Sequence, residues 1–294
     1  MKHKFYSNIL YSDKKTAMNK AKQDVGTILD AMGYQPINFD FDSKSIKPIK
    51  WFRYLIQAFN AIHIVPRDGT FLLQYPTYFG TWFECILLDF FRRKNVKTIV
   101  LIHDVIQLRD QQLLDTKHYK KVLNVFNRAD FIISHSPKMT GILRRVGVHT
   151  PIFNLVLFDY LTESISQTQY SNRVINFAGN LDKSPFILKL SKNPKIQLNV
   201  FGNQPSFDLP KEIKYCGAFD PELLTGEFHS GFGLVWDGPE IDVMSGIGLY
   251  QKFNIPHKVS MYLAAGIPVI IWSEAAVAQV IKKHGVGIVV DSLK

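Results

Sequence analysis

The chain has 294 residues, of which 46% are hydrophobic and 20% are charged, and this ordinary globular composition excludes wholesale disorder, collagen and coiled coil. A chain of this length has room for two domains. Lys and Arg number 35 against 25 Asp and Glu, and the resulting net charge of +10 favours an anionic partner such as a phosphate group, an acidic membrane surface or nucleic acid.

The two cysteines, Cys85 and Cys216, form no disulfide framework and no paired-cysteine metal motif, so we expect a reducing, cytoplasmic setting. The N-terminus lacks the uninterrupted apolar core of a signal peptide. The two most apolar segments, 82–91 and 259–272, are interrupted by acidic residues and by a Gly-Ile-Pro sequence. Neither reaches the roughly 20 apolar residues of a membrane span, so we expect any membrane contact to be peripheral.

Short β-rich apolar runs alternate with segments of helical periodicity in the first half, which is typical of βαβ units with a parallel sheet. The expected strands are 5–11, 36–39, 70–74, 98–102, 131–134 and 153–157. The expected helices are 16–32, 78–94, 111–128 and 137–145. Gly33 follows the first of these helices and Ser136-Pro137 opens the last, which are common helix end and start signals.

A polar, serine-rich segment over residues 159–172 predicts a linker, and a second α/β series follows it. Its expected strands are 173–178, 197–201, 213–215, 233–236, 268–272 and 287–290, with helices beginning at Pro185, His257 and Glu274. The chain is therefore predicted to be α/β, with domains at 1–158 and 173–294. Because parallel sheets bind ligands beyond the carboxyl ends of their strands, we expect the two sheets to face an interdomain cleft.

The segment 176–185 reads as a strand, a glycine turn and a helix start, with Gly179 at the turn, Ser184 as the cap and Pro185 at the first helical position. This geometry aims backbone N–H groups at an anion, and Lys183 adds a full positive charge. The alternative is an ordinary strand-to-helix turn that binds nothing.

The segment 254–272 predicts a helix with Lys258 in its first turn, a stop at Gly266 and a strand. The positive end of the helix dipole disfavours a lysine there by some tenths of a kcal/mol. A bound diphosphate reverses this preference, because a unit-charge pair at about 4 Å and a dielectric of about 20 is worth about 4 kcal/mol before desolvation. The alternative for Lys258 is a surface lysine whose ammonium group reaches solvent.

Three phrases together resemble the GT-B glycosyltransferases, and within them the bacterial accessory-secretion glucosyltransferase 3 family with its putative galactofuranosyltransferase relatives. They are LIHDVIQLR at 101–109, FAGNLDKS at 177–184 and PHKVSMYLAAGIPVI at 256–270. The resemblance implies two Rossmann-like domains and transfer of glucose from UDP-glucose to N-acetylglucosamine on Ser or Thr of a serine-rich repeat adhesin. Two alternatives stay open: galactofuranose transfer in polysaccharide synthesis, and a non-catalytic partner subunit that binds a sugar or a protein.

Matched by motif, the resemblance implies donor-site roles for Lys183, Tyr215 and Lys258. The ring of Tyr215 is expected to stack on uracil or to close over the ribose, with a packing role equally open. Further donor contacts are expected from Gly179, from the Asn180 amide and, across the cleft, from Thr16.

The stereochemistry is inferred from a pattern that the chain lacks. Many retaining GT-B enzymes carry two glutamates eight positions apart, whereas Val235 stands eight positions after Glu227. We therefore expect inversion, which needs a base to take the acceptor proton. His103 and Asp104 follow a predicted strand and are the candidates, although Asp104 is also suited to capping the next turn. Arg109 and Asp13 are candidate acceptor-side residues.

Metal and cofactor motifs are weak. Asp40-Phe41-Asp42 matches an Asp-x-Asp metal motif by chance, in our interpretation, and no dinucleotide or P-loop fingerprint is complete, so we expect neither a metal nor a cofactor. The basic clusters, including Lys14-Lys15-Lys20-Lys22, are interpreted as solvated helix faces, with no nucleic-acid partner. The aromatics Trp51, Phe52, Tyr54 and Phe59 suggest a homo-oligomer contact. Folds of this kind usually end with a helix that crosses back to the first domain, and we expect that helix to be missing after Lys294.

Overall fold

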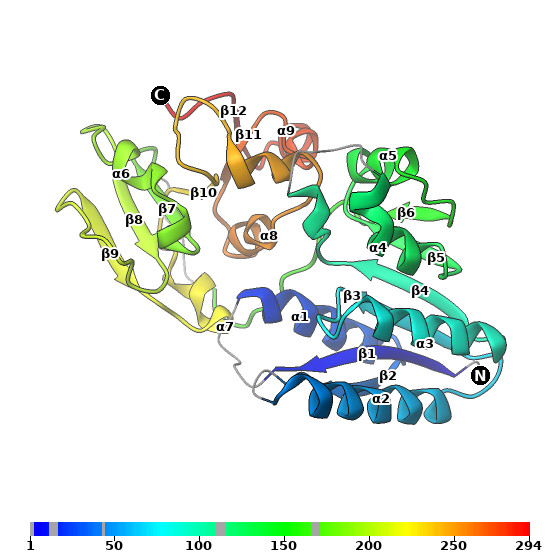
Figure 1. Cartoon of the computed structure of the whole chain (residues 1–294). Coiled ribbons are helices and arrows are strands. Elements are labelled where there is room, and N and C mark those ends of the chain that lie inside the picture. The colour runs from blue at the N-terminus through cyan, green and yellow to red at the C-terminus, as the bar shows by residue number, and fades with distance from the viewer. Residues whose placement is uncertain (1–2, 12–16, 43–44, 110–115, 166–170) are drawn as a thin grey trace. The chain divides into compact units, whose positions relative to one another are not determined.

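The computed structural model describes residues 3–11, 17–42, 45–109, 116–165 and 171–294. The chain forms two compact units, Met1–Leu155 and Val156–Lys294 (Figure 1). The division falls three residues before the predicted end of the first domain. The predicted cleft between the two halves stays a prediction.

The first unit is a six-stranded parallel sheet with the order β2-β1-β3-β4-β5-β6. Its strands are β1 (Lys4–Leu10), β2 (Gln35–Asp40), β3 (Thr70–Tyr75), β4 (Lys97–Ile102), β5 (Phe131–Ser134) and β6 (Ile152–Asn154). Its helices are α1 (Ala17–Ala31), α2 (Lys47–Ile64), α3 (Thr81–Arg93), α4 (Thr116–Phe126) and α5 (Pro137–Arg145), with a 3₁₀ turn η1 (Ile106–Leu108). The six predicted strands of this half are confirmed within a few residues at their ends.

Two helices differ from the prediction. Helix α2 was not among the predicted helices. Apolar residues occupy both its core side and its solvent side, and they obscure the 3.6-residue period. Helix α3 begins three residues later than predicted, because Tyr78 at φ 65° and Gly80 at φ 104° have left-handed backbone conformations that no helix contains.

The second unit is also a six-stranded parallel sheet, with the order β12-β11-β10-β7-β8-β9. Its strands are β7 (Val174–Ala178), β8 (Gln197–Phe201), β9 (Ile213–Gly217), β10 (Phe232–Val235), β11 (Val269–Trp272) and β12 (Gly287–Val290). Its helices are α6 (Phe186–Leu190), α7 (Pro221–Leu224), α8 (His257–Ala264) and α9 (Ala278–His284), with 3₁₀ turns η2 (Leu181–Lys183), η3 (Thr225–Glu227) and η4 (Gly246–Lys252). Two parallel sheets with flanking helices confirm the α/β prediction.

The helix starts of the second unit correct two sequence expectations. Ser184 does not cap α6 and Pro185 is not its first helical residue, because Pro185 is itself the residue before the helix. The cap lies earlier, where the Asn180 side chain accepts a hydrogen bond from the backbone N–H of Lys183 and closes η2. Helix α9 begins at Ala278, four residues after the predicted Glu274.

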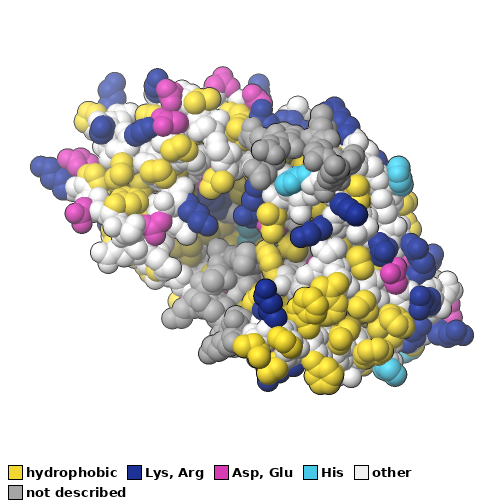
Figure 2. All heavy atoms as spheres, viewed as in Figure 1, with side chains coloured by type: hydrophobic (Ala, Val, Ile, Leu, Met, Phe, Trp, Pro, Cys, Tyr) yellow, Lys and Arg dark blue, Asp and Glu magenta, His cyan; other side chains and the backbone are white. Residues whose placement is uncertain are grey.

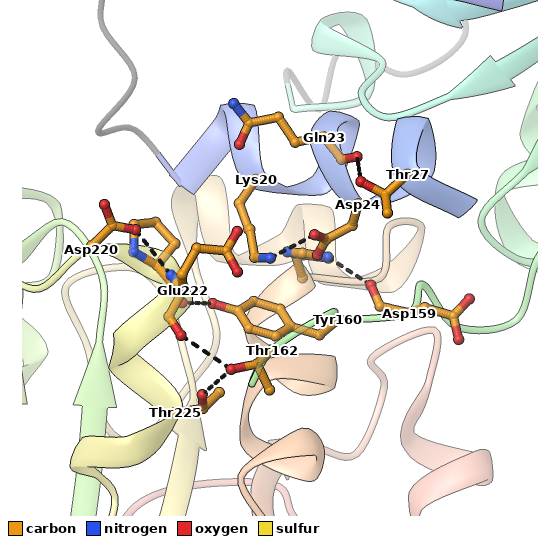
Figure 3. A network of polar contacts seen from close by, with 12 residues as sticks. Lys20, Gln23, Asp24, Thr27, Asp159, Tyr160, Thr162, Asp220, Glu222 and Thr225 are labelled. Atoms are coloured by element: carbon orange, nitrogen blue, oxygen red, sulfur yellow. Dashed lines mark hydrogen bonds and ion pairs between the residues drawn. The ribbon is translucent and has the colours of Figure 1, made fainter. Parts of the chain in front are cut away.

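The described part of the predicted linker packs on the second unit. The Tyr160 hydroxyl donates to the carbonyl of Pro221 at 2.6 Å, and the hydroxyls of Thr162 and Thr225 lie 2.7 Å apart (Figure 3). Both contacts reach α7 or the turn after it. The start of the segment is therefore fixed by side-chain hydrogen bonds to this unit.

Close packing at Gly233 leads to a stability prediction. A Cβ at this position on β10 would lie 2.1 Å from the ring of Tyr262, which is fully buried and accepts a hydrogen bond from the Ala178 N–H. We expect Gly233→Ala to lower the free energy of unfolding by about 1–3 kcal/mol or more, through overpacking. Thermal and urea unfolding measure this change. The matched control is Gly141→Ala on α5, where nothing lies within 4 Å of the added carbon and a small stabilisation is expected. Equal behaviour of the two variants would contradict the packing argument.

The buried His135 makes stability depend on pH. Its ring Nε2 lies 3.0 Å from the Ile102 carbonyl, and burial lowers its pKa from 6.5 to about 4 against the opposing effect of that hydrogen bond. Between pH 6.5 and pH 4 the unfolded chain binds a proton that the folded chain does not, so stability falls as pH falls. The difference amounts to about 3 kcal/mol at pH 4. Urea unfolding should show this loss in the wild type and in the exposed control His149→Gln, and a smaller one in His135→Gln. Identical pH slopes in all three would refute it.

Other described features bear on ligands. Within the described ranges no helix is both long and apolar enough to cross a membrane. The same ranges contain no group of three or more His, Cys, Asp or Glu side chains placed to hold a metal ion. Asp42 of the Asp-x-Asp tripeptide has a structural use, because it accepts hydrogen bonds from the Ser45 N–H and the Arg53 guanidinium at 2.8 Å each.

Candidate functional site

The second unit has a topological switch point between β7 and β10. The chain runs from β7 to β8 and β9 on one side of the sheet, and then returns to the other side for β10, β11 and β12. Loops diverge where the strand order reverses, and parallel sheets bind ligands at the carboxyl ends of the strands there. The segments at this place are Gly179-Asn180 after β7 and Trp236-Asp237 after β10.

Lys258 reaches this switch point from the first turn of α8. Its Nζ lies 3.3 Å from Asp237 Oδ1 and 4.9 Å from the centre of the Phe177 ring, and a Cβ on Gly179 would lie 3.7 Å from it. The side chain is only 19% exposed. Most of the Lys258 side chain is therefore buried, and its ammonium group faces the Asp237 carboxylate. The ammonium group lies between the loops that follow β7 and β10.

Asp237 is a site residue that the sequence analysis missed. Its Oδ2 accepts a hydrogen bond from Gln251 Nε2 of η4 at 2.8 Å, while its Oδ1 faces Lys258. The signal was present, because an acidic residue directly follows a predicted strand at its carboxyl end. Gln251 is buried, and its Oε1 has no hydrogen-bond partner among the described residues. The Gln251 side chain therefore supports the Asp237 carboxylate from within the core.

The loop after β8 also approaches Gly179. A Cβ on Gly202 would lie 2.2 Å from the Gly179 carbonyl oxygen, so only glycine allows the two loops to come this close. The Tyr215 hydroxyl donates to the Gly202 carbonyl at 3.0 Å, which places Tyr215 beside this pair of loops. Its side chain is 40% exposed. Strand β9 continues to Gly217, so Tyr215 lies within the strand and not at its end as predicted.

Lys183 and Asn180 lie on the turn after β7. Lys183 is exposed at the end of η2, four residues after Gly179, and Asn180 Oδ1 accepts from its backbone N–H. Asp182 in the same turn accepts two hydrogen bonds from Ser206, which fix the turn in place and lower the pKa of Asp182. The structure thus brings Lys258 to Gly179 and leaves Lys183 at the rim of the same turn.

The first unit contains a pocket of about 240 Å³ beyond the carboxyl ends of β3 and β4. Asp104 lines it and is buried, and its Oδ2 accepts from the Arg109 guanidinium at 2.6 Å. The other lining residues are Tyr75, Pro76, Tyr78, Gly80, Thr81, Glu84, Ile106, Gln107 and Lys121. Aromatic rings, carboxylates and a lysine together suit a polar ligand with an apolar face, such as a sugar.

His103 is oriented by the sheet. Its Nε2 lies 2.8 Å from Gln74 Oε1, while Gln74 Nε2 donates to the Ser7 carbonyl at 3.1 Å. Since Gln74 presents an oxygen, the His103 Nε2 carries the proton. His103 is not among the residues that line the pocket. Of the two candidate bases, Asp104 is therefore the one that faces it.

Lys22 corrects the interpretation of its basic cluster as a solvated helix face. Its Nζ donates to the Pro76 carbonyl at 2.6 Å and to the Tyr11 hydroxyl at 3.2 Å, and lies 4.9 Å from the centre of the Tyr78 ring. Burial lowers its pKa to about 7, although Glu84 and Asp104 favour the charged form. Tyr11 follows β1 and Pro76 follows β3, so Lys22 lies at the switch point of the first sheet.

Two further points concern candidates in this unit. Lys20, of the same cluster as Lys22, forms an ion pair with Asp24 one turn along α1 (Figure 3). Thr16 and Asp13, the other two predicted site residues of this half, lie outside the described residues.

Comparison with known proteins gives matches in both halves. Residues 4–157 match the model of the glucosyltransferase 3-like N-terminal domain, and residues 175–294 match the model of the C-terminal domain. The chain is 34% identical over 217 residues to β-1,6-galactofuranosyltransferase WbbI of Escherichia coli (strain K12), covering 71% of this chain and 62% of WbbI. It is 28% identical over 295 residues to glucosyltransferase 3 of Streptococcus gordonii, covering 93% of this chain and 80% of that protein. The chain thus matches less than two thirds of the length of WbbI.

Solved structures show the same fold. Sucrose-phosphate synthase of Thermosynechococcus elongatus has a TM-score of 0.67 at 12% identity, covering 99% of this chain and 87% of that one. HepE of Anabaena in complex with UDP has a TM-score of 0.59 at 11% identity, covering 99% and 86%. With matches to both domain models, the chain belongs to the glucosyltransferase 3-like family and has the GT-B fold of two Rossmann-like domains.

Proposed function

We propose that the chain is a glycosyltransferase that uses a nucleotide-sugar donor, bound by the second unit at the switch point between β7 and β10. The observation that carries this proposal is the position of Lys258, whose Nζ lies 3.3 Å from Asp237 and next to Gly179. A partly buried cation beside a strand-end glycine turn suits a diphosphate. The names of the related proteins and the UDP bound in HepE support the same reaction class.

Different donor-site residues contact the diphosphate and the nucleoside. Lys258 and the exposed Lys183 neutralise the diphosphate, which becomes more negative as the glycosidic bond to it breaks. The Gly179 N–H donates to the Phe201 carbonyl at 3.0 Å, so the turn offers the Asn180 N–H to the same phosphates, and Tyr215 packs on the nucleoside. These cations supply the charge in our mechanism, and no metal is assigned to it.

The sugar itself meets Asp237. Its carboxylate, which the buried Gln251 amide holds at 2.8 Å, accepts hydrogen bonds and so suits the hydroxyl groups of a hexose. Glucose from UDP-glucose, transferred to N-acetylglucosamine on a serine-rich glycoprotein, is the first candidate reaction. The name of glucosyltransferase 3 of S. gordonii supports glucose as the transferred sugar, and the donor nucleotide and the acceptor come from the resemblance of the sequence motifs. Galactofuranose is the second candidate, supported by the 34% identity to WbbI. A binding screen over UDP-glucose, UDP-galactose, UDP-galactofuranose and UDP-N-acetylglucosamine distinguishes them.

The acceptor reaction uses the pocket of the first unit. Asp104 takes the proton of the attacking acceptor hydroxyl, and Arg109 holds its carboxylate in place at 2.6 Å. The hydroxyl oxygen then forms the new bond to the anomeric carbon while the bond to the diphosphate breaks. Attack from the face opposite the leaving group inverts the anomeric centre.

Thermal unfolding with UDP in the presence of EDTA tests the donor site. A ligand at 100 times its Kd adds about 2.7 kcal/mol to stability, so we expect the Tm to rise by several degrees. Uridine, which lacks the phosphates, serves as the control and should shift the Tm much less. Equal shifts of the Tm with uridine and with UDP, or no shift with UDP, would contradict a diphosphate site. Sugar transfer or donor hydrolysis by the purified chain would exclude a non-catalytic subunit.

A further inference from the structure

Helix α2 presents apolar side chains to solvent as well as to the core. Tyr54, Ala58, Ala61 and Ile62 are buried on its inner side. On its outer side, residues 49, 52, 56 and 59 recur every three or four positions and so form one stripe along the helix. The exposed fractions are 47% for Ile49, 65% for Phe52, 44% for Ile56 and 52% for Phe59.

Neighbouring aromatic residues extend this stripe. The ring of Trp51, 57% exposed, lies 5.9 Å from that of Trp82 on α3, and Phe59 lies 6.3 Å from Phe90. Figure 2 shows hydrophobic side chains gathered over the part of the molecule where Figure 1 draws α2. Single exposed apolar residues are ordinary, whereas a contiguous patch of this kind marks an interaction surface.

The charges around the stripe are all of one sign on the helix itself. Helix α2 carries Lys47, Lys50 and Arg53 and no acidic residue. Arg93 adds a further cation above the Phe90 ring at 5.4 Å. Asp42 pairs with Arg53 at 2.8 Å and compensates one of these charges. The surface therefore combines exposed Trp, Phe and Ile with an excess of basic groups.

We propose that the exposed face of α2 docks on an anionic lipid surface. Aromatic and branched side chains enter the interface of a bilayer, and the basic residues beside them are attracted to an anionic leaflet. A second copy of the chain is less suited to this face, because a two-fold contact would bring the same basic residues of both copies together. Docking through α2 is independent of the function proposed above and requires only the fold.

Vesicle co-sedimentation of the full chain tests this docking. The anionic vesicles contain phosphatidylcholine and about 30% phosphatidylglycerol. We expect at least tenfold more protein bound to them than to vesicles of phosphatidylcholine alone. Phe52→Glu/Phe59→Glu should lower binding at least tenfold. The matched control is Ile165→Glu/Leu223→Glu, which adds the same two charges at apolar residues that are 65% and 57% exposed in the second unit. Circular dichroism and the Tm verify that both variants fold.

Tryptophan fluorescence measures insertion into the lipid, and size-exclusion chromatography measures the oligomeric state. Trp236 and Trp272 are buried and should not respond to lipid. A blue shift of the tryptophan emission on adding anionic vesicles therefore reports insertion at α2 if the Trp51→Phe variant reduces that shift. Binding lost only in the α2 variant, and weakened by salt, supports the proposal. Three results overturn it: no binding to anionic vesicles, equal binding by both double variants, or a wild-type dimer that the α2 substitutions convert to a monomer without any lipid binding.

Discussion

Lys258→Ala is expected to lower kcat/KM for the nucleotide sugar by about 10²–10³-fold. One charge pair with the diphosphate is worth about 4 kcal/mol before desolvation, and each 1.36 kcal/mol corresponds to a factor of ten. The side chain is 19% exposed, so water replaces this charge poorly. Loss of the charge weakens the binding of the diphosphate in the ground state. It weakens the transition state more, because the leaving group gains negative charge there. Steady-state kinetics and calorimetric titration with UDP measure both effects.

Two further lysine variants make this expectation specific. Lys258→Arg keeps the positive charge and should recover part of the lost activity. Lys283→Ala removes an exposed lysine from α9 of the same unit and should change kcat/KM by less than about twofold. Full activity in Lys258→Ala, or an equal loss in the α9 variant, would contradict a donor site at this switch point.

Asp104→Asn should lower kcat by about 10²–10⁴-fold, the range for loss of a general base. Asparagine has nearly the same shape and still faces the pocket, but it takes no proton from the acceptor hydroxyl. Because the donor binds to the other unit in our proposal, UDP affinity should stay within about twofold of the wild type. Transfer assays and calorimetry separate the two quantities.

The matched control for this substitution is Asp89→Asn. Asp89 pairs with Arg128 at 3.0 Å in the same unit, as Asp104 pairs with Arg109, but it does not line the pocket. The control should retain transfer activity. Normal turnover in Asp104→Asn would assign the base elsewhere, with His103→Gln as the next variant to measure.

Short-range sequence signals predicted much of the fold. Apolar runs of three to seven residues separated by helical periods specify parallel β-strands and helices without knowledge of tertiary contacts, and the twelve strands of the two sheets were located this way. Helix α2, which the sequence did not predict, shows the limit of the method, and the short helix α7 was not predicted either. The apolar residues of α2 lie both on the buried side and on the exposed side of the helix. The sequence therefore lacks the 3.6-residue period that an apolar stripe on one side would produce.

The candidate site was predictable only in part. Lys258 stood out because a lysine is unfavourable at a helix start, which is a local property. Its contacts with Asp237 and Phe177 join residues from three separate segments, and no local period relates them. The same holds for Lys22, which reads as an ordinary surface lysine until Pro76, 54 positions away, accepts its hydrogen bond.

The sequence by itself determined the class of the fold, the order of its strands and the lysine in the first turn of α8. Tertiary structure alone decided which side chains meet that lysine and which face of α2 stays in solvent. The physical reason is that parallel strands bring their carboxyl ends to one edge of a sheet whatever their separation along the chain. Burial, which lowers the pKa of Lys22 to about 7 and that of His135 to about 4, likewise depends on neighbours that only the folded sheet assembles.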